Sequence, residues 1–361
     1  MNGRYFEGDY PELVDRLESH FRRVRESWDE RKFDGSLVLG GGYGRGEGGV
    51  MKIGEKVEFS NDLDYFLFNP NPTNPELLDW AKRIEREETD RLGIDVEIKC
   101  LTEESVGDPQ GSMMFSDLIA GNEVVAGDAS FLQKLPARLD FSKIGAEEAT
   151  RLLWNRGSGL FFAGCRMNRA DQLGYVIRNH AKAKLALGDA WLCLNGQYHP
   201  QCRERGARLQ KAELADALGK LKAWHLEGVE FKFNPVCTGI SWETLEQERN
   251  GLIKAWAEVY LMAESARLSK SIPDFATYLS LPRVLPAYGI CKNLALAARD
   301  RLKRGAFLRP LGDYPRGALM RALPCLLGQT DGGVSEAARF LPISTGSDME
   351  STYARWWAYY A

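Results

Sequence analysis

Apolar residues follow two different spacings along the chain and divide it into two regions. In the first region, short apolar runs bounded by glycine, proline or asparagine predict strands at 36–39, 57–59, 62–68 and 93–101. Helical spacing of apolar residues predicts helices at 10–30 and 76–92. This order of elements predicts a small mixed β-sheet with helices on one face.

From about residue 146 onward the pattern is helical. Apolar positions predict helices at 146–168, 171–193, 208–225, 241–269, 284–304 and 315–328, and a docking helix at 353–360. A length of 361 residues favours two domains. We therefore expect an α+β fold, with a mixed-sheet domain at residues 1–135 followed by an all-α domain at residues 136–361.

Paired carboxylates follow a glycine loop, residues 40–47, in the first region. Asp62 and Asp64 share one face of their strand, because strand side chains alternate with period two. Two ionised carboxylates in one place repel each other, and a hard cation with oxygen ligands would compensate them. Asp95 and Glu97 also share a face, and one of them would complete a carboxylate triad suited to two metal ions.

The run Gly-Gly-Tyr-Gly-Arg-Gly-Glu at 41–47, with Asp-Leu-Asp at 62–64 and Ile-Asp-Val at 94–96, resembles the nucleotidyltransferase superfamily with the DNA polymerase β-like fold. The loop looks most like that of the bacterial uridylyltransferases that modify the PII signalling protein. It is also similar to the loop of the aminoglycoside nucleotidyltransferases. The resemblance covers residues 36–101, under a third of the chain.

The resemblance implies a site for a nucleoside triphosphate and two Mg²⁺ ions, with Mn²⁺ as a substitute. Its metal ligands would be Asp62, Asp64 and a third acid, which Asp95 matches best and Glu97 second. The third acid would also help to deprotonate the acceptor hydroxyl. The residues implied at the phosphates are Gly41, Gly42, Tyr43 and Arg45, with Lys182 and Lys184 from the helical domain. For Arg45, an ion pair with a carboxylate is an equal alternative to contact with the phosphates. For Lys182 and Lys184, the alternative is a position on a solvated helix face.

Two features depart from the family pattern. The stretch 47–62 is longer than in these relatives, and we expect it to form a hairpin arm over the site. The sequence has no obvious match to the histidine-aspartate hydrolase or ligand-sensing domains of the PII-modifying enzymes, so PII is not implied as the acceptor. The rival dinucleotide-binding fingerprint, matched by Gly44, Gly46 and Gly49, requires a helix directly after the loop, and no helix start is present there.

The resemblance thus implies magnesium-dependent transfer of a nucleoside monophosphate from a triphosphate to an acceptor hydroxyl, with release of pyrophosphate. A small molecule or a protein is favoured over RNA as the acceptor. The alternatives are a toxin-like enzyme that modifies tRNA or another RNA, a synthase of a nucleotide second messenger, and an inactive nucleotide-binding regulator.

Charge and composition add three expectations. Residues 1–130 hold 15 Lys and Arg against 28 Asp and Glu, whereas residues 131–361 hold 32 against 22, so the basic half suits polyphosphate or another anion. The seven cysteines are scattered without a Cys-x-x-Cys pair, which disfavours structural zinc and disulfides. No run has the length of a membrane span and the N-terminus lacks a signal-peptide core, so we expect a cytoplasmic protein without a membrane partner.

Overall fold

The computed structural model describes residues 3–106, 111–135, 139–285, 289–342 and 348–360. The fold is α+β, and the chain forms two compact units. The first unit consists of Met1–Gly145, Asn195–Ala212 and Leu226–Val236, and the second of Ala146–Leu194, Glu213–His225 and Cys237–Ala361. The predicted boundary at 135/136 lies before the first transition between the units, and the chain then returns to the first unit twice.

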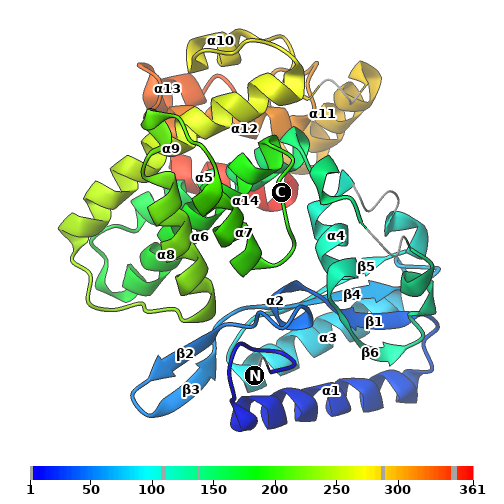
Figure 1. Ribbon diagram of the computed structural model, residues 1–361. Coiled ribbons are helices and arrows are strands. Elements are labelled where there is room, and N and C mark those ends of the chain that lie inside the picture. Colours follow the sequence, from blue (N-terminus) through cyan, green and yellow to red (C-terminus); the bar gives the residue numbers. More distant parts are fainter. Residues whose placement is uncertain (1–2, 107–110, 136–138, 286–288, 343–347, 361) are drawn as a thin grey trace. The chain divides into compact units, whose positions relative to one another are not determined.

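The first unit is built on a four-stranded mixed sheet (Figure 1). Its strands are β1 (Ser36–Leu39), β4 (Leu63–Phe68), β5 (Val96–Leu101) and β6 (Glu123–Gly127), in the spatial order β5-β4-β1-β6. β4 and β5 are parallel, while β1 is antiparallel to both β4 and β6. The predicted mixed sheet is confirmed; β6 has no counterpart in the sequence prediction.

Helices cover both faces of this sheet. Alternate residues of β4, such as Leu63 and Tyr65, pack in a core with α1 (Pro11–Arg31) and α3 (Pro75–Leu92). Phe66 and Phe68 point to the other face, where they meet Phe115 of α4 (Met113–Ala120). The prediction of helices on one face was wrong, because β4 is apolar on both sides and each side needs a cover.

A buried polar network joins α1 and α3 to β4. The His20 ring lies 2.8 Å from a Glu88 carboxylate oxygen through Nδ1 and 2.7 Å from the Tyr65 hydroxyl through Nε2. An ionised carboxylate only accepts hydrogen bonds, so Nδ1 carries the proton and Tyr65 donates to Nε2. Arg23 adds two hydrogen bonds to Glu88, and Arg91 adds a third at 3.2 Å. Together these bonds hold β4 in place directly beside Asp64.

The predicted hairpin between the glycine loop and Asp62 is confirmed, while its expected position over the site stays a prediction. It consists of β2 (Val50–Ile53) and β3 (Lys56–Phe59), paired antiparallel with the turn at Gly54, and Figure 1 shows it projecting away from the four-stranded sheet. A strand therefore follows the glycine loop, where the dinucleotide fingerprint would require a helix.

Two helical segments return to the first unit. α7 (Cys202–Lys211) belongs to it entirely, and the unit boundary falls within α8 (Leu221–Phe233), after His225. The predicted helix at 208–225 was wrong, because the chain leaves α7 at Ala212 with extended backbone and forms only a short 3-10 turn before α8. Apolar residues continue at helical spacing through this break, so the pattern did not indicate that the helix ends there.

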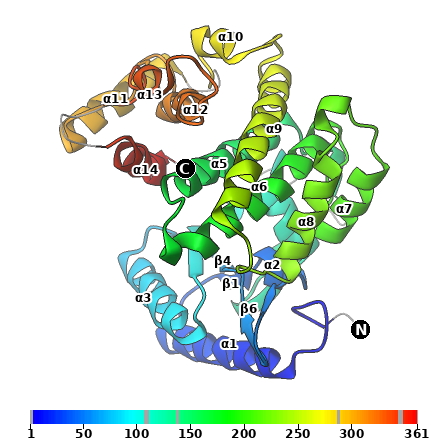
Figure 2. The same ribbon diagram turned by 90° about the vertical axis from the view of Figure 1, so that its left-hand side faces the viewer.

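The second unit is helical in its described residues. α5 (Ala146–Cys165), α6 (Leu173–Leu194) and α9 (Trp242–Leu268) pack against one another, as Figure 2 shows. The remaining helices are α10 (Phe275–Ser280), α11 (Ile290–Arg304), α12 (Pro315–Leu326), α13 (Gly333–Ala337) and α14 (Met349–Tyr360). None of the helices in the described parts of the chain combines the length and apolarity that a membrane crossing requires.

Candidate functional site

The glycine loop begins with a single helical turn at the end of β1. The Gly40 N–H donates to the Asp64 carbonyl at 2.8 Å, and α2 (Gly41–Gly44) closes with a bond from the Gly44 N–H to the Gly40 carbonyl at 2.9 Å. The N–H groups of Gly41, Gly42 and Tyr43 precede that first bond, so the turn itself leaves them without a partner. Such a group of successive N–H donors is suited to an anion.

Gly41 brings the loop backbone against a carboxylate. Its φ is +61°, and a Cβ atom there would lie 2.3 Å from Asp64 Oδ2. Both the left-handed backbone and the close approach therefore require glycine. The predicted phosphate-binding loop and the predicted acidic strand meet at this contact.

Strand register brings the acids of β4 and β5 together. Asp64 pairs with Glu97 in the parallel ladder, so their side chains lie on the same face of the sheet. Asp95 precedes β5 and accepts a hydrogen bond from the Leu63 N–H through its carbonyl, at 2.9 Å. Asp62 and Asp64 are half-buried, whereas Asp95 and Glu97 are exposed.

Charges around Asp64 identify its neighbours. Burial raises the pKa of Asp64 above its usual range, Lys99 and Arg45 oppose this shift, and Asp62 and Glu97 add to it. The ladder places Glu97, which the resemblance ranked second as the third acid, opposite Asp64, and Asp95 directly before β5.

The donor set fits Mg²⁺ only in part. The available ligands are carboxylate oxygens, which a hard cation prefers. Among the described residues, no three His, Cys, Asp or Glu side chains are grouped closely enough to hold an ion by themselves. Mg²⁺ commonly takes one or two carboxylates and completes its coordination with water and substrate phosphates. Asp62 and Asp64 satisfy that smaller requirement.

A buried carboxylate fixes the far end of the glycine loop. Glu47 is 6% exposed and accepts hydrogen bonds from the Cys202 N–H, at 2.6 Å, and from Lys232. Burial alone would raise the pKa of Glu47, but the charges of Lys232 and Arg45 hold it below the ordinary value. The loop is thereby tied to α7 and to the end of α8.

Arg45 extends this ion network. Its guanidinium lies 3.4 Å from Glu47 and 3.3 Å from Asp117 on α4, and the Tyr198 hydroxyl donates to Asp117 at 2.9 Å. The Arg45 side chain is only 10% exposed. These contacts favour the carboxylate-pairing alternative for Arg45 over contact with a triphosphate.

The other predicted phosphate ligands have different surroundings. The Tyr43 side chain is fully buried, packs edge-on against Phe6 and Phe59 and donates to the Gly49 carbonyl at 3.4 Å, so the side chain is not available to a phosphate. Lys182 and Lys184 lie on α6 in the second unit. Lys184 is buried and pairs with Glu248 at 2.5 Å.

Sequence reasoning missed three charged residues at the site. Lys99 continues the period-two pattern of Glu97 along β5, and its position on the same face could have been inferred from that spacing. Asp117 and Lys232 reach the loop from distant segments. No local signal in the sequence indicates them.

Comparisons of the chain with protein-family models, with curated proteins and with solved structures found no match.

Proposed function

We propose that the protein is a nucleotidyltransferase, which moves a nucleoside monophosphate from a nucleoside triphosphate to an acceptor hydroxyl. The observation that carries this proposal is the packing of Asp64 against the Gly41 backbone, with the charges of Asp62 and Glu97 acting on it. Backbone donors suit the phosphates of a nucleotide, and adjoining carboxylates suit the divalent cation that accompanies them. The acceptor is a small molecule or a protein.

In this proposal the protein positions the reactants. The N–H groups of Gly41, Gly42 and Tyr43 donate to phosphate oxygens, and the anchored Glu47 keeps the loop in the binding conformation. Asp62 and Asp64 would hold Mg²⁺, which would neutralise charge on the phosphates. Preorganised donors of this kind need no rearrangement during the reaction.

The reaction exchanges one phosphoester bond for another. The acceptor oxygen forms a bond to the α-phosphorus as the bond to the bridging oxygen breaks, and pyrophosphate leaves with that electron pair. The hydroxyl proton passes to a carboxylate, for which the exposed Glu97 opposite Asp64 is suited. Catalysis rests on orientation and charge neutralisation rather than on a covalent intermediate.

The test is incubation of the protein with each α-³²P-labelled nucleoside triphosphate and Mg²⁺, with and without a cell lysate. Wild type should transfer label to an acceptor, whereas Asp62→Asn and Asp64→Asn should not. Asp90→Asn, at an exposed position on α3, is the matched control and should behave as wild type.

The destination of the label distinguishes the related activities. Nuclease-sensitive product indicates an RNA acceptor, and a dinucleotide formed without lysate indicates a second-messenger synthase. Triphosphate binding without transfer to any acceptor would replace the proposal with a regulatory binding role. Equal transfer by wild type and Asp64→Asn would contradict it.

A further inference from the structure

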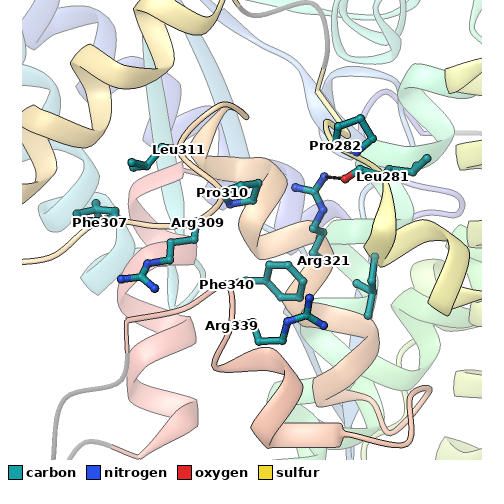
Figure 3. Close-up of a pocket in the computed structure, with 10 residues that line it drawn as sticks. Leu281, Pro282, Phe307, Arg309, Pro310, Leu311, Arg321, Arg339 and Phe340 are labelled. Carbon is teal, nitrogen blue, oxygen red and sulfur yellow. Dashed lines mark hydrogen bonds between the residues drawn. The ribbon is translucent and has the colours of Figure 1, made fainter.

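We propose that the second unit contains a binding pocket for a small organic anion, a molecule with an apolar body and one anionic head group. The pocket is a cavity of about 580 Å³ in the C-terminal helices of this unit (Figure 3). Pockets of a few hundred Å³ are typical of small-ligand sites. This proposal goes beyond the nucleotidyltransferase function and uses none of the residues assigned to it.

The lining of the cavity is apolar with a cationic part. Figure 3 shows the Phe340 ring in the middle of the lining residues, with Arg309, Arg321 and Arg339 around it. The apolar members are Leu279, Leu281, Pro282, Phe307, Pro310, Leu311 and Phe340. None of the described residues that line the cavity is acidic, and the neighbouring carboxylates of Asp313 and Glu336 pair with Arg321 and Arg339.

Two exposed guanidinium groups supply the anion-binding donors. The central guanidinium carbon of Arg309 lies 5.6 Å from the centre of the Phe307 ring. The Arg309 side chain is exposed and forms no hydrogen bond or ion pair with the described residues. Arg339 pairs with Glu336 at 3.3 Å, and the Arg339 side chain is 65% exposed. The guanidinium groups of Arg309 and Arg339 can therefore donate hydrogen bonds to a carboxylate or a phosphate.

A third arginine, Arg321, stabilises the segments that surround the pocket. Arg321 is 1% exposed, pairs with Asp313 at 2.8 Å and donates to the Leu281 carbonyl at 2.7 Å. Asp313 also accepts from the N–H groups of Val284 and Leu285. The charge of Arg321 is thus matched inside the protein, and its role is to fix the segments around the cavity.

A hydrogen bond joins two further parts of the lining. The Arg309 N–H donates to the Phe340 carbonyl at 3.0 Å, which links the segment after α11 to the segment after α13. Arg309 and the buried Phe340 ring are thereby kept at one place. A pocket formed in advance loses less entropy on binding than one that must be ordered.

These features select the ligand class. A free inorganic anion would gain nothing from contact with the apolar lining residues. A neutral apolar molecule would displace water from the arginines without replacing the lost hydrogen bonds. An aromatic phosphate and an alkyl carboxylate share the required chemistry. The experiment therefore includes one of each, with inorganic phosphate and a neutral aromatic as comparisons.

Isothermal titration calorimetry of the full chain tests the proposal, with EDTA present to remove divalent cations. The probes are 1-naphthyl phosphate, decanoate, inorganic phosphate and 1-naphthol. At least one of the two organic anions should bind to one site, about tenfold or more tighter than inorganic phosphate and 1-naphthol.

The double variant Arg309→Gln/Arg339→Gln locates the binding. It should weaken binding of the organic anion by about tenfold or more, since it removes the charged donors. The matched control is Arg151→Gln/Arg169→Gln, which removes two exposed arginines elsewhere in the same unit and should bind as wild type.

Each outcome decides the proposal. Loss of naphthyl phosphate binding in the first double variant alone supports an aromatic anion, and the same loss for decanoate supports an alkyl anion. Absence of binding by both organic anions overturns the proposal. Binding that survives Arg309→Gln/Arg339→Gln, or that is as tight for 1-naphthol, overturns it as well.

Discussion

Gly41 and Asp64 lie so close together that a Cβ atom at Gly41 would come within 2.3 Å of Asp64 Oδ2. This contact joins the glycine loop after β1 to the acidic strand β4. It makes the loop conformation and the orientation of one carboxylate depend on each other.

The first prediction tests this contact through glycine replacement. Gly41→Ala should abolish magnesium-dependent nucleotide transfer, because the added methyl group displaces the Asp64 carboxylate. The matched control is Gly54→Ala in the β2–β3 turn, where φ is +63°. A Cβ atom added at Gly54 would have no atom within 4 Å apart from those of its chain neighbours. Both variants should lose about 1–2 kcal/mol of stability in urea unfolding from the left-handed backbone alone. Equal activity of the two variants would contradict the role of the contact.

A second prediction separates Glu97 in β5 from Asp95, which directly precedes that strand. Glu97→Gln should lower the turnover number of nucleotide transfer about a hundredfold, because Glu97 pairs with Asp64 in the ladder and acts on its charge. Asp95→Asn should retain most of the activity. Steady-state kinetics of both variants provide the measurement, and the reverse order of effects would restore Asp95 as the third acid.

A third prediction concerns the anchor of the glycine loop. Glu47→Gln leaves Lys232 and Arg45 without their shared negative partner, so we expect a loss of about 3 kcal/mol in the free energy of unfolding. Urea denaturation measures it, with the exposed Glu55→Gln as the control that should change little. Unchanged stability in Glu47→Gln would show that the ion network does not hold the loop.

A fourth prediction concerns acid stability. The hydrogen bonds from His20 and Arg23 outweigh burial and lower the pKa of Glu88 from 4.5 to about 2. A depressed carboxyl pKa stabilises the fold above the unfolded value, and this contribution is lost as pH falls from about 4.5 towards about 2. Because the Arg23 side chain is 36% exposed and partly screened, we expect a loss of about 2 kcal/mol.

Urea unfolding across this pH range provides the measurement for Glu88. The Glu88→Gln variant should show a smaller dependence on pH, while Asp90→Asn should follow wild type. Burial lowers the pKa of His20, so protonation of that ring adds to the acid destabilisation rather than opposing it. Identical pH profiles for wild type and Glu88→Gln would exclude this network as the cause.

Much of the first unit could be predicted from the sequence. Alternation of apolar and acidic residues predicted β4 and placed Asp62 and Asp64 on one face, and the asparagine and glycine at the ends of α3 act as caps. These features depend on residues a few positions apart, so a local pattern contains them. The break between α7 and α8 could not be predicted, because apolar spacing continues through it.

The sequence by itself determined that a glycine loop precedes an acidic strand and that a helical region follows the sheet. Only the tertiary structure decided that Glu97 lies opposite Asp64, since strand register depends on the pairing of two separate segments. It also decided that Glu47 meets Lys232, 185 residues away along the chain. Local periodicity is set by neighbouring residues, whereas register and buried ion pairs arise only when distant segments pack together.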